Sequence, residues 1–179
     1  MQITSIHEIS IYEDPQTLEE ICRLRVHAWR ARTDRFPVGL RAWSDEFDAT
    51  STHFAVRVSD RVVAAARLSI ATQPTKGPDG AVYSAVEAGT ASPPVAFFSR
   101  LVVCHEHAGR GFPRMLDAAR LSRAKEAGCR SILANTDAGE RRIRQLEGYG
   151  FHRLYTAVAG AAGPLQEFST PTVLGMSIA

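Results

Sequence analysis

The apolar positions of this chain change their period several times, and each change marks an expected element. The longest apolar run covers residues 95–103 and is interrupted only by Ser99 and Arg100. Such a run, rich in β-branched and aromatic residues, is typical of a strand that is covered on both faces. We therefore predict a central buried strand here. A helix is predicted after it, because apolar residues recur at helical spacing at Phe112, Met115, Leu116 and Ala119.

A first strand and a helix are predicted before the central strand. Residues 3–12 alternate loosely in hydrophobicity, which favours a strand. Asp14 and Pro15 then form a typical helix start, with Asp14 as the cap and Pro15 in the first turn. One apolar stripe of this helix carries Leu18, Ile21, Cys22 and Trp29. Arg25 falls on the same stripe, where an arginine usually extends its charged end to solvent and less often serves a function.

A hairpin lies between two loops. Residues 33–48 are loop-like, and strands are predicted over residues 53–58 and 61–70 around a Ser59-Asp60 turn. Residues 72–94 are punctuated by glycines and prolines and form a segment too long for an ordinary connection. Loops of this length are often lids or binding segments, so a lid is one interpretation of the segment.

The last third of the chain continues the alternation of helices and strands. Gly128 is expected to end the helix that follows the central strand, and Asp137 to cap a further helix that runs through Leu146. Strands are expected at residues 131–134 and 151–158, with one or two more within 165–178. This order predicts an α/β fold, with a mixed sheet of about seven strands flanked by helices on both faces.

Composition bounds the class of protein. A chain of 179 residues with 45% apolar and 22% charged residues is expected to form a single domain over residues 1–179. Its net charge of +2 does not favour a nucleic-acid partner. No segment has the pattern of a signal peptide or a membrane span, and the three cysteines have no disulfide-like spacing, so we expect a cytoplasmic protein with free thiols and no membrane partner.

The junction between the central strand and its helix is the first candidate for chemistry. Gly109 and Gly111 allow the backbone to turn tightly, and Pro113 suits the first helical turn, where its missing N–H is no loss. The unpaired amides and the dipole at a helix start attract anions. The junction can therefore hold a pyrophosphate.

Four segments carry a family resemblance: SRLVV, AGRGFPRML, AKEAGCRSILAN and RRIRQLEGYGF. In this order and spacing, over about residues 50–155, they resemble the GNAT superfamily of acyl-CoA-dependent N-acyltransferases. The resemblance implies a GNAT-like fold, acyltransferase activity, and acetyl-CoA or another acyl-CoA as co-substrate. It also implies two sets of cofactor-binding residues. The pantetheine arm would pair with Leu101, Val102 and Val103, and the phosphates would lie against Ala108, Gly109, Arg110, Gly111, Phe112, Pro113 and Arg114.

Three positions depart from the pattern of that family. Ala108 stands where the family has Gln or Arg, and Pro113 stands where it has Gly or Ala. Pro113 removes one amide from the phosphate site, which Arg110 and Arg114 are placed to compensate. Leu146 occupies the position at which the family usually has a tyrosine acting as general acid.

A second resemblance covers residues 20–103. Arg25, Trp29, the WSDEFD segment with Asp45 and Asp48, Arg67, and Ser99-Arg100 resemble the pattern of autoinducer synthases and N-acyl amino acid synthases. Those enzymes share the GNAT fold and take long acyl chains, often from acyl carrier protein. Phe97 stands where the autoinducer synthases have a carboxylate. The implied substrate-binding residues are Arg25, Trp29, Trp43, Asp45, Phe97 and Phe98.

Acyl transfer to an amine requires a neutral amine, a positioned thioester carbonyl, and donors for the oxyanion that develops. The central strand can supply a backbone N–H to that oxyanion, and Val102 is the expected donor. Asp45, Asp48 and Glu87 are candidates for the base. Asp48, Arg67 and Arg100 are the candidate catalytic side chains, as a buried charge network beside the acceptor pocket. An equally weighted alternative is that they only clamp the loop to the sheet.

Two further features resemble chemical sites, a metal cluster and a nucleophile, but we interpret both as structural. His105-Glu106-His107 resembles a metal-binding cluster, but it lacks a distant third partner in the sequence, so no metal is expected. Cys104 ends an apolar strand, so a buried inert thiol is favoured over a nucleophile.

Three functions remain open from the sequence. The first is an N-acyltransferase that moves an acetyl or other short acyl group from CoA to the amine of a small molecule. The second is a long-chain N-acyl amino acid or signal-molecule synthase that uses acyl-CoA or acyl carrier protein. The third is a GNAT-fold module that binds acyl-CoA without turnover, suggested by Ala108, Pro113 and Leu146. The oligomeric state, with a homodimer as one option, is also open.

Overall fold

The computed structural model describes residues 6–9, 14–158, 164 and 170–178. The contacts within the chain define two compact units, each made of two segments. The first unit comprises Met1–Leu68 and Arg100–Leu121, and the second comprises Ser69–Ser99 and Ser122–Ala179. The single domain that the length and composition of the chain indicate stays a prediction. The parts of the predicted strands at residues 3–5, 10–12 and 165–169 lie outside the described residues.

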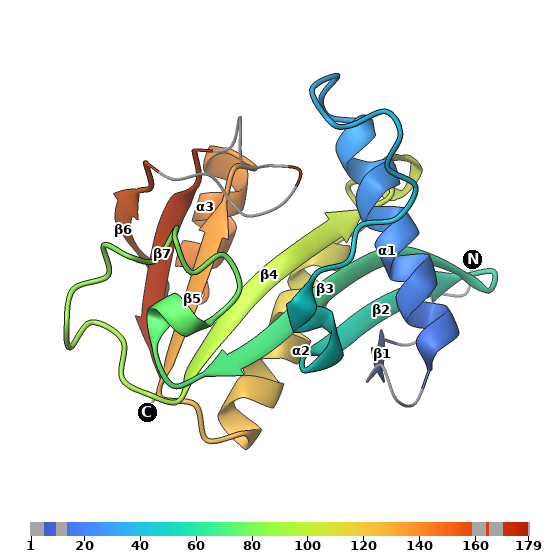
Figure 1. Ribbon diagram of the computed structural model, residues 1–179. Helices are drawn as coiled ribbons and strands as arrows, with labels where there is room; N and C mark the ends of the chain where they lie inside the picture. Colours follow the sequence, from blue (N-terminus) through green and yellow to red (C-terminus); the bar gives the residue numbers. More distant parts are fainter. Residues whose placement is uncertain (1–5, 10–13, 159–163, 165–169, 179) are drawn as a thin grey trace. The chain divides into compact units, whose positions relative to one another are not determined.

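The described residues contain seven strands and three α-helices (Figure 1). Their order along the chain is β1 (Ile6–Ile9), α1 (Pro15–Arg30), β2 (Thr52–Val58), β3 (Arg61–Ala71), β4 (Val95–Val103), α2 (Phe112–Glu126), β5 (Ser131–Thr136), α3 (Glu140–Glu147), β6 (His152–Thr156) and β7 (Thr172–Ser177). Short 3₁₀ turns occupy Glu46–Ala49, Pro74–Lys76 and His105–His107. The predicted α/β order and the strand count are confirmed.

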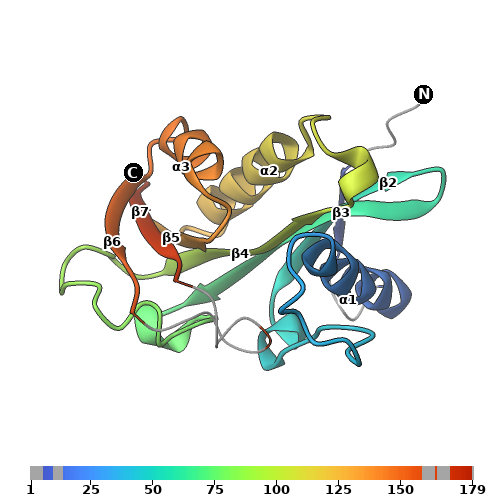
Figure 2. The same ribbon diagram turned by 90° about the horizontal axis from the view of Figure 1, so that it is seen from above.

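The first unit is built on antiparallel strands. β1 pairs with β2, and β2 pairs with β3, through a tight turn in which Ser59 and Asp60 both have positive φ. Such a turn follows the right-handed twist of the two strands, as the hairpin prediction requires. Within this unit α1 and the start of α2 lie on opposite faces of the strands (Figure 2). The core under α1 joins Ile21, Leu24, Ala28, Ala55, Ala65 and Val102.

Helix α1 begins as its sequence predicts. The carboxylate of Asp14 accepts a hydrogen bond from the backbone N–H of Thr17 at 2.9 Å, and Pro15 is the first helical residue. The pattern of this helix predicts that the charged end of Arg25 extends to solvent, and this prediction is wrong. Its side chain is fully buried, because a carboxylate from a distant part of the chain lies against it.

The second unit combines parallel and antiparallel pairing. Residues 95–98 of β4 run parallel to residues 131–134 of β5, and β7 pairs antiparallel with both β5 and β6. Its apolar core contains Val82, Tyr83, Val95, Phe97, Leu133, Ala157 and Val173. Val82 and Tyr83 come from the long segment 72–94, so part of that segment belongs to the core of the unit.

One predicted element end differs from the structure. Helix α3 begins at Glu140 with Gly139 as its cap, so the expected cap at Asp137 is wrong. The reason is local: the hydroxyl of Thr136 accepts a hydrogen bond from the N–H of Ala138, which extends the turn, and Gly139 has a φ of +74°. In the described part of residues 165–178 there is one strand, β7.

Among the helices that the structure describes, none combines the length and the apolar character needed to cross a bilayer.

Candidate functional site

The glycine turn between β4 and α2 is exposed. Gly109 and Gly111 have φ values of +79° and +82°, a region that favours glycine, and a Cβ on either residue would meet no atom within 4 Å. The two glycines are therefore required by backbone conformation and not by a lack of space. The amides of Arg114 and Met115 both donate to the carbonyl of Gly111, at 3.0 and 3.3 Å, so the helix starts directly after this residue.

The backbone of β4 changes conformation just before this turn. Arg100 has a φ of +52°, which is uncommon for a residue other than glycine and costs free energy. The parallel register described between β4 and β5 ends at Phe98, two residues earlier. After the break, Val102 is buried, and the N–H of Cys104 donates to the carbonyl of Val63 at 2.8 Å. The strand that leads to the glycine turn is thus held on its β3 side.

A buried ion network joins α1, the loop before β2, and β3. Arg25 forms a bidentate ion pair with Asp48, with nitrogen–oxygen distances of 2.8 and 2.9 Å. Arg67 donates to Asp48 at 2.8 Å and to Asp45 at 2.5 Å. The backbone N–H of Asp45 also donates to Asp48, at 3.0 Å. Arg25 and Arg67 have no exposed surface and Asp48 is 3% exposed, so the network is shielded from water.

The network reaches the surface at Asp45 and Arg100. The Nη2 atom of Arg100 lies 2.7 Å from Oδ2 of Asp45, and its guanidinium lies 4.3 Å from the centre of the Trp43 ring. The side chain of Asp45 is 22% exposed, compared with 6% for Arg100. Asp45 is therefore the carboxylate of the network that a small molecule can approach.

The electrostatics explain which protonation states are present. Burial alone would raise the pKa of Asp48, but the hydrogen bonds and charges of Arg25 and Arg67 outweigh it and hold that pKa well below its usual range. The pKa of Asp45 is lowered in the same way, since Arg67 and Arg100 outweigh the effect of its burial. Both carboxylates are ionised at neutral pH and are weak proton acceptors.

His53 is a residue of this site that the sequence did not single out. Its side chain is fully buried on β2, and its Nε2 lies 3.0 Å from the backbone carbonyl oxygen of Asp48. Burial lowers the pKa of His53, so the ring is neutral. In the sequence this histidine only fills one position in an alternating strand, and no local signal separates it from an exposed one.

The other predicted substrate residues lie in apolar clusters. Trp29 stacks on Phe36 with ring centroids 6.5 Å apart, and Phe36 contacts Trp43 at 5.9 Å. In the second unit, Phe97 packs edge-on against Tyr83 at 5.3 Å, and Phe98 packs against Phe151 at 5.7 Å. Within the first unit, the structure thus brings together Arg25, Trp43, Asp45, Asp48, Arg67 and Arg100. Their roles in substrate binding or catalysis stay a prediction.

Two positions that bear on the choice of acid and base, Leu146 and Glu87, belong to the second unit. Leu146, at the position of the family's tyrosine, is buried and apolar, and Glu87 is exposed in the long segment of the second unit. Cys104 is only half-buried, contrary to the expectation of a buried thiol, because it lines a cavity that is open to solvent.

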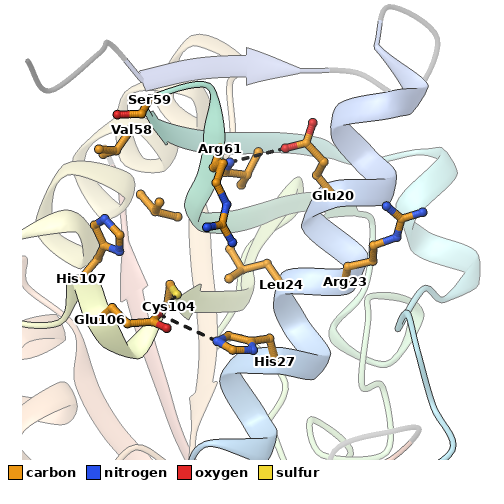
Figure 3. A pocket seen from close by; sticks show the side chains of 12 residues that line it. Glu20, Arg23, Leu24, His27, Val58, Ser59, Arg61, Cys104, Glu106 and His107 are labelled. Carbon is orange, nitrogen blue, oxygen red and sulfur yellow. Dashed lines mark hydrogen bonds and ion pairs between the residues drawn. The ribbon is translucent and has the colours of Figure 1, made fainter.

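That cavity, of about 630 Å³, lies between α1, the β2–β3 hairpin and the loop after β4 (Figure 3). Its described lining residues are Glu20, Arg23, Leu24, His27, Val58, Ser59, Arg61, Val62, Val63, Cys104, Glu106 and His107. None of these belongs to the predicted substrate or cofactor sets. The cavity is thus a separate feature of the first unit.

A buried strand that leads through an open glycine turn into a helix forms a geometry that can bind the pyrophosphate of a carrier. The model of the acetyltransferase (GNAT) family matches residues 15–158. The chain therefore belongs to the acetyltransferase (GNAT) family and is an acyltransferase by class.

Solved structures with the same fold include two kinds of acyltransferase. A CoA-dependent acyl-homoserine lactone synthase, BjaI, solved with SAM and isopentyl-CoA, has a TM-score of 0.71 at 18% identity, covering 97% of this chain and 83% of that one. The AHL synthase LasI has a TM-score of 0.69 at 15% identity, with coverages of 98% and 91%. The ribosomal-protein-S18-alanine N-acetyltransferase from Escherichia coli has a TM-score of 0.60 at 11% identity, with coverages of 98% and 94%. A search of curated proteins found no match.

Proposed function

We propose that this protein transfers a short acyl group, such as acetyl, from acyl-CoA to the amine of a small molecule. The amine nitrogen attacks the thioester carbonyl, and the carbon–sulfur bond breaks after an oxyanion intermediate. The products are an amide and the free thiol of CoA. The proton of the attacking amine leaves to solvent water, and the departing thiolate takes up a proton.

The exposed glycine turn is the observation that carries the proposal. Gly109 and Gly111 hold a conformation suited to an anion-binding turn, and α2 begins directly after Gly111. The amide of Val102 lies on the strand that leads to this turn and would donate to the oxyanion. Leu101 and Val103 would pair with the pantetheine arm. All of these residues belong to the first unit.

The acceptor would bind near Asp45 and Trp43. Asp45 is the partly exposed end of the ion network, and a carboxylate held ionised at neutral pH attracts an ammonium group before it loses its proton. Asp48 is saturated by Arg25, Arg67 and the amide of Asp45. We therefore assign Asp48 to positioning the acceptor site and not to accepting a proton from the substrate.

A donor panel tests this proposal. The purified chain would be mixed with acyl-CoA thioesters from acetyl to long-chain, each with a set of small amines, and the release of free CoA thiol would be followed. We expect release that depends on the amine and is fastest with short acyl groups. Binding of acyl-CoA without thiol release for any amine would instead support the non-catalytic module suggested by Ala108, Pro113 and Leu146.

A specific observation favours a second candidate, a synthase of signal-type N-acyl compounds. The residues shared with the autoinducer synthase pattern, Arg25, Asp45, Asp48, Arg67 and Arg100, form one connected ion network in the structure. The fold is also similar to two acyl-homoserine lactone synthases, at TM-scores of 0.71 and 0.69. Such a synthase would use a longer acyl group from CoA or from acyl carrier protein.

The same panel separates the two candidates when S-adenosylmethionine and free amino acids are included as amines. Preference for a long acyl chain, or activity only with acyl carrier protein, would favour the synthase. Preference for acetyl-CoA would favour the short-chain transferase. The packing of Phe97 against Tyr83 supports a preference for acetyl-CoA, because it leaves the apolar surroundings of Phe97 filled by protein.

A further inference from the structure

A cluster of four metal-ligating side chains lies beside the cavity along α1, and three of the four line that cavity. His27 extends from α1, and Cys104, His105 and Glu106 follow one another directly after β4. One ligand atom from each of the four residues lies within 4.8 Å of all the others. The sequence suggested no metal at His105-Glu106-His107, because no distant partner was visible. The fold supplies that partner, His27, from 78 positions upstream of His105.

We propose that His27, Cys104, His105 and Glu106 form a binding site for a divalent cation of the zinc type. Imidazole nitrogen, thiolate sulfur and carboxylate oxygen are the ligands that Zn²⁺ takes in proteins, usually four at a time. The set contains two nitrogens, one sulfur and one oxygen, and it excludes His107. The proposal does not depend on the proposed acyl transfer.

The distances are close to those of a tetrahedral site. His105 Nδ1 lies 3.6 Å from Glu106 Oε2, and His27 Nε2 lies 3.9 Å from the same oxygen. Ligand atoms around a tetrahedral zinc ion are roughly 3.4 Å apart. The imidazole rings of His27 and His105 have centroids 5.6 Å apart, a separation at which both rings can bind one ion. The most distant pair of ligand atoms, at up to 4.8 Å, must close by about 1.4 Å, which rotation of the exposed side chains permits.

The existing contacts converge on the carboxylate of Glu106. The thiol of Cys104 donates to Glu106, and His27 lies opposite the same carboxylate (Figure 3). A cation at this point would replace the thiol proton, which passes to solvent as the sulfur becomes a ligand. The side chains of His27, His105 and Glu106 are 52%, 60% and 56% exposed, so an ion can enter from solvent.

A bound ion would join α1 to the loop that leads into the glycine turn. His105 lies four residues before Gly109, and Cys104 is tied to β3 through its backbone N–H. The ion would therefore act as a structural cross-link within the first unit. Its expected effect is a higher melting temperature of the full chain when zinc is present, because binding to the folded state alone stabilises that state.

The test uses the purified full chain after treatment with a chelator. Zn²⁺ binding is measured by calorimetry, and Co²⁺ serves as a spectroscopic probe, since a cobalt–thiolate bond gives a charge-transfer band. We expect one ion per chain and a thiolate band with Co²⁺. Cys104→Ser should remove the band, and His27→Ala should weaken binding by more than the ~10–100-fold cost of losing an outer-shell partner.

His107→Ala is the matched control, because His107 lines the same cavity but lies outside the ligand cluster. It should keep both the stoichiometry and the cobalt band. The proposal is overturned if the chain takes up no Zn²⁺ or Co²⁺. It is also overturned if Cys104→Ser and His27→Ala both bind like the unchanged chain, or if His107→Ala loses the ion as they do. Circular dichroism of each variant would establish that it is folded.

Discussion

Asp48 is the residue on which the charged groups of the first unit converge. It accepts hydrogen bonds from Arg25, from Arg67 and from the amide of Asp45. Each of these groups would be costly to bury alone, and each is compensated by the same carboxylate. Removing that carboxylate leaves two buried guanidinium groups short of their partner.

We expect Asp48→Asn to lower the free energy of unfolding by about 3–5 kcal/mol, because breaking a buried ion pair leaves uncompensated charge. Urea denaturation measures the difference. Glu19→Gln is the matched control: it removes the exposed pair between Glu19 and Arg23 on α1, and should change stability by about 0.5 kcal/mol or less. Equal effects of the two substitutions would contradict a stabilising role of the network.

His53 should make stability depend on pH near neutrality. Burial lowers its pKa below the ordinary value of 6.5, so the unfolded chain binds this proton more readily than the folded chain. Stability is then fully present above about pH 6.5 and falls as the pH decreases below it, until the folded-state pKa is passed. Asp45 and Asp48, whose pKa values are also lowered, contribute stability that is lost only at pH values below 3.8.

Thermal or urea unfolding of the chain between about pH 7.5 and pH 5 checks this dependence. His53→Gln should flatten the decrease. His152→Gln, at an exposed position of β6, should leave it unchanged. A profile that His53→Gln does not alter would show that another group is responsible.

At the scale of elements, the turn between β4 and α2 was predictable because its signals are local. Gly109, Gly111 and Pro113 lie within five residues of one another. The glycines permit a positive φ and the proline fixes its own φ, and neither effect depends on the rest of the chain. The structure confirms the helix start and the exposed turn. The positive φ of Arg100 was not predictable, because arginine has no intrinsic preference for that region.

Gly111→Ala tests the turn. Alanine at a φ of +82° costs about 1–2 kcal/mol, and relaxing that strain would move the amides of the turn. Under the proposed function, we expect the KM for acyl-CoA to rise with this variant, measured by thiol release. Gly39→Ala is the matched control, since Gly39 also has open space around it but no positive φ. A KM that both variants leave unchanged would count against the turn as the phosphate site.

At the scale of the whole molecule, the long segment 72–94 shows the limit of local reasoning. Its glycines and prolines suggest a mobile connection, and a lid was one interpretation. In the structure, Val82 and Tyr83 belong to the core of the second unit, and Tyr83 contacts Phe97. Asn135 of β5 donates to the hydroxyl of Tyr83 at 3.0 Å. These contacts connect the segment to strands that are distant in sequence.

Gly77→Ala tests how closely this segment packs. A Cβ at Gly77 would come closer than 3.0 Å to the ring of Phe97, so we expect a loss of about 1–3 kcal/mol in the free energy of unfolding, as for other overpacked cores. In a Phe97→Leu background the same substitution should cost less. A double-mutant cycle by urea denaturation measures this coupling. Strictly additive effects would show that the two residues do not meet.

The sequence by itself determined the order of helices and strands, the Asp14 cap, the hairpin turn and the glycine junction, because each depends on residues within one or two turns of each other. Only the tertiary structure decided where charged and ligating groups meet. Arg25 and Asp48 are 23 positions apart, and His27 and Cys104 are on separate elements. The period of hydrophobicity indicates which residues are buried, but which distant residues share one place depends on how the strands and helices pack.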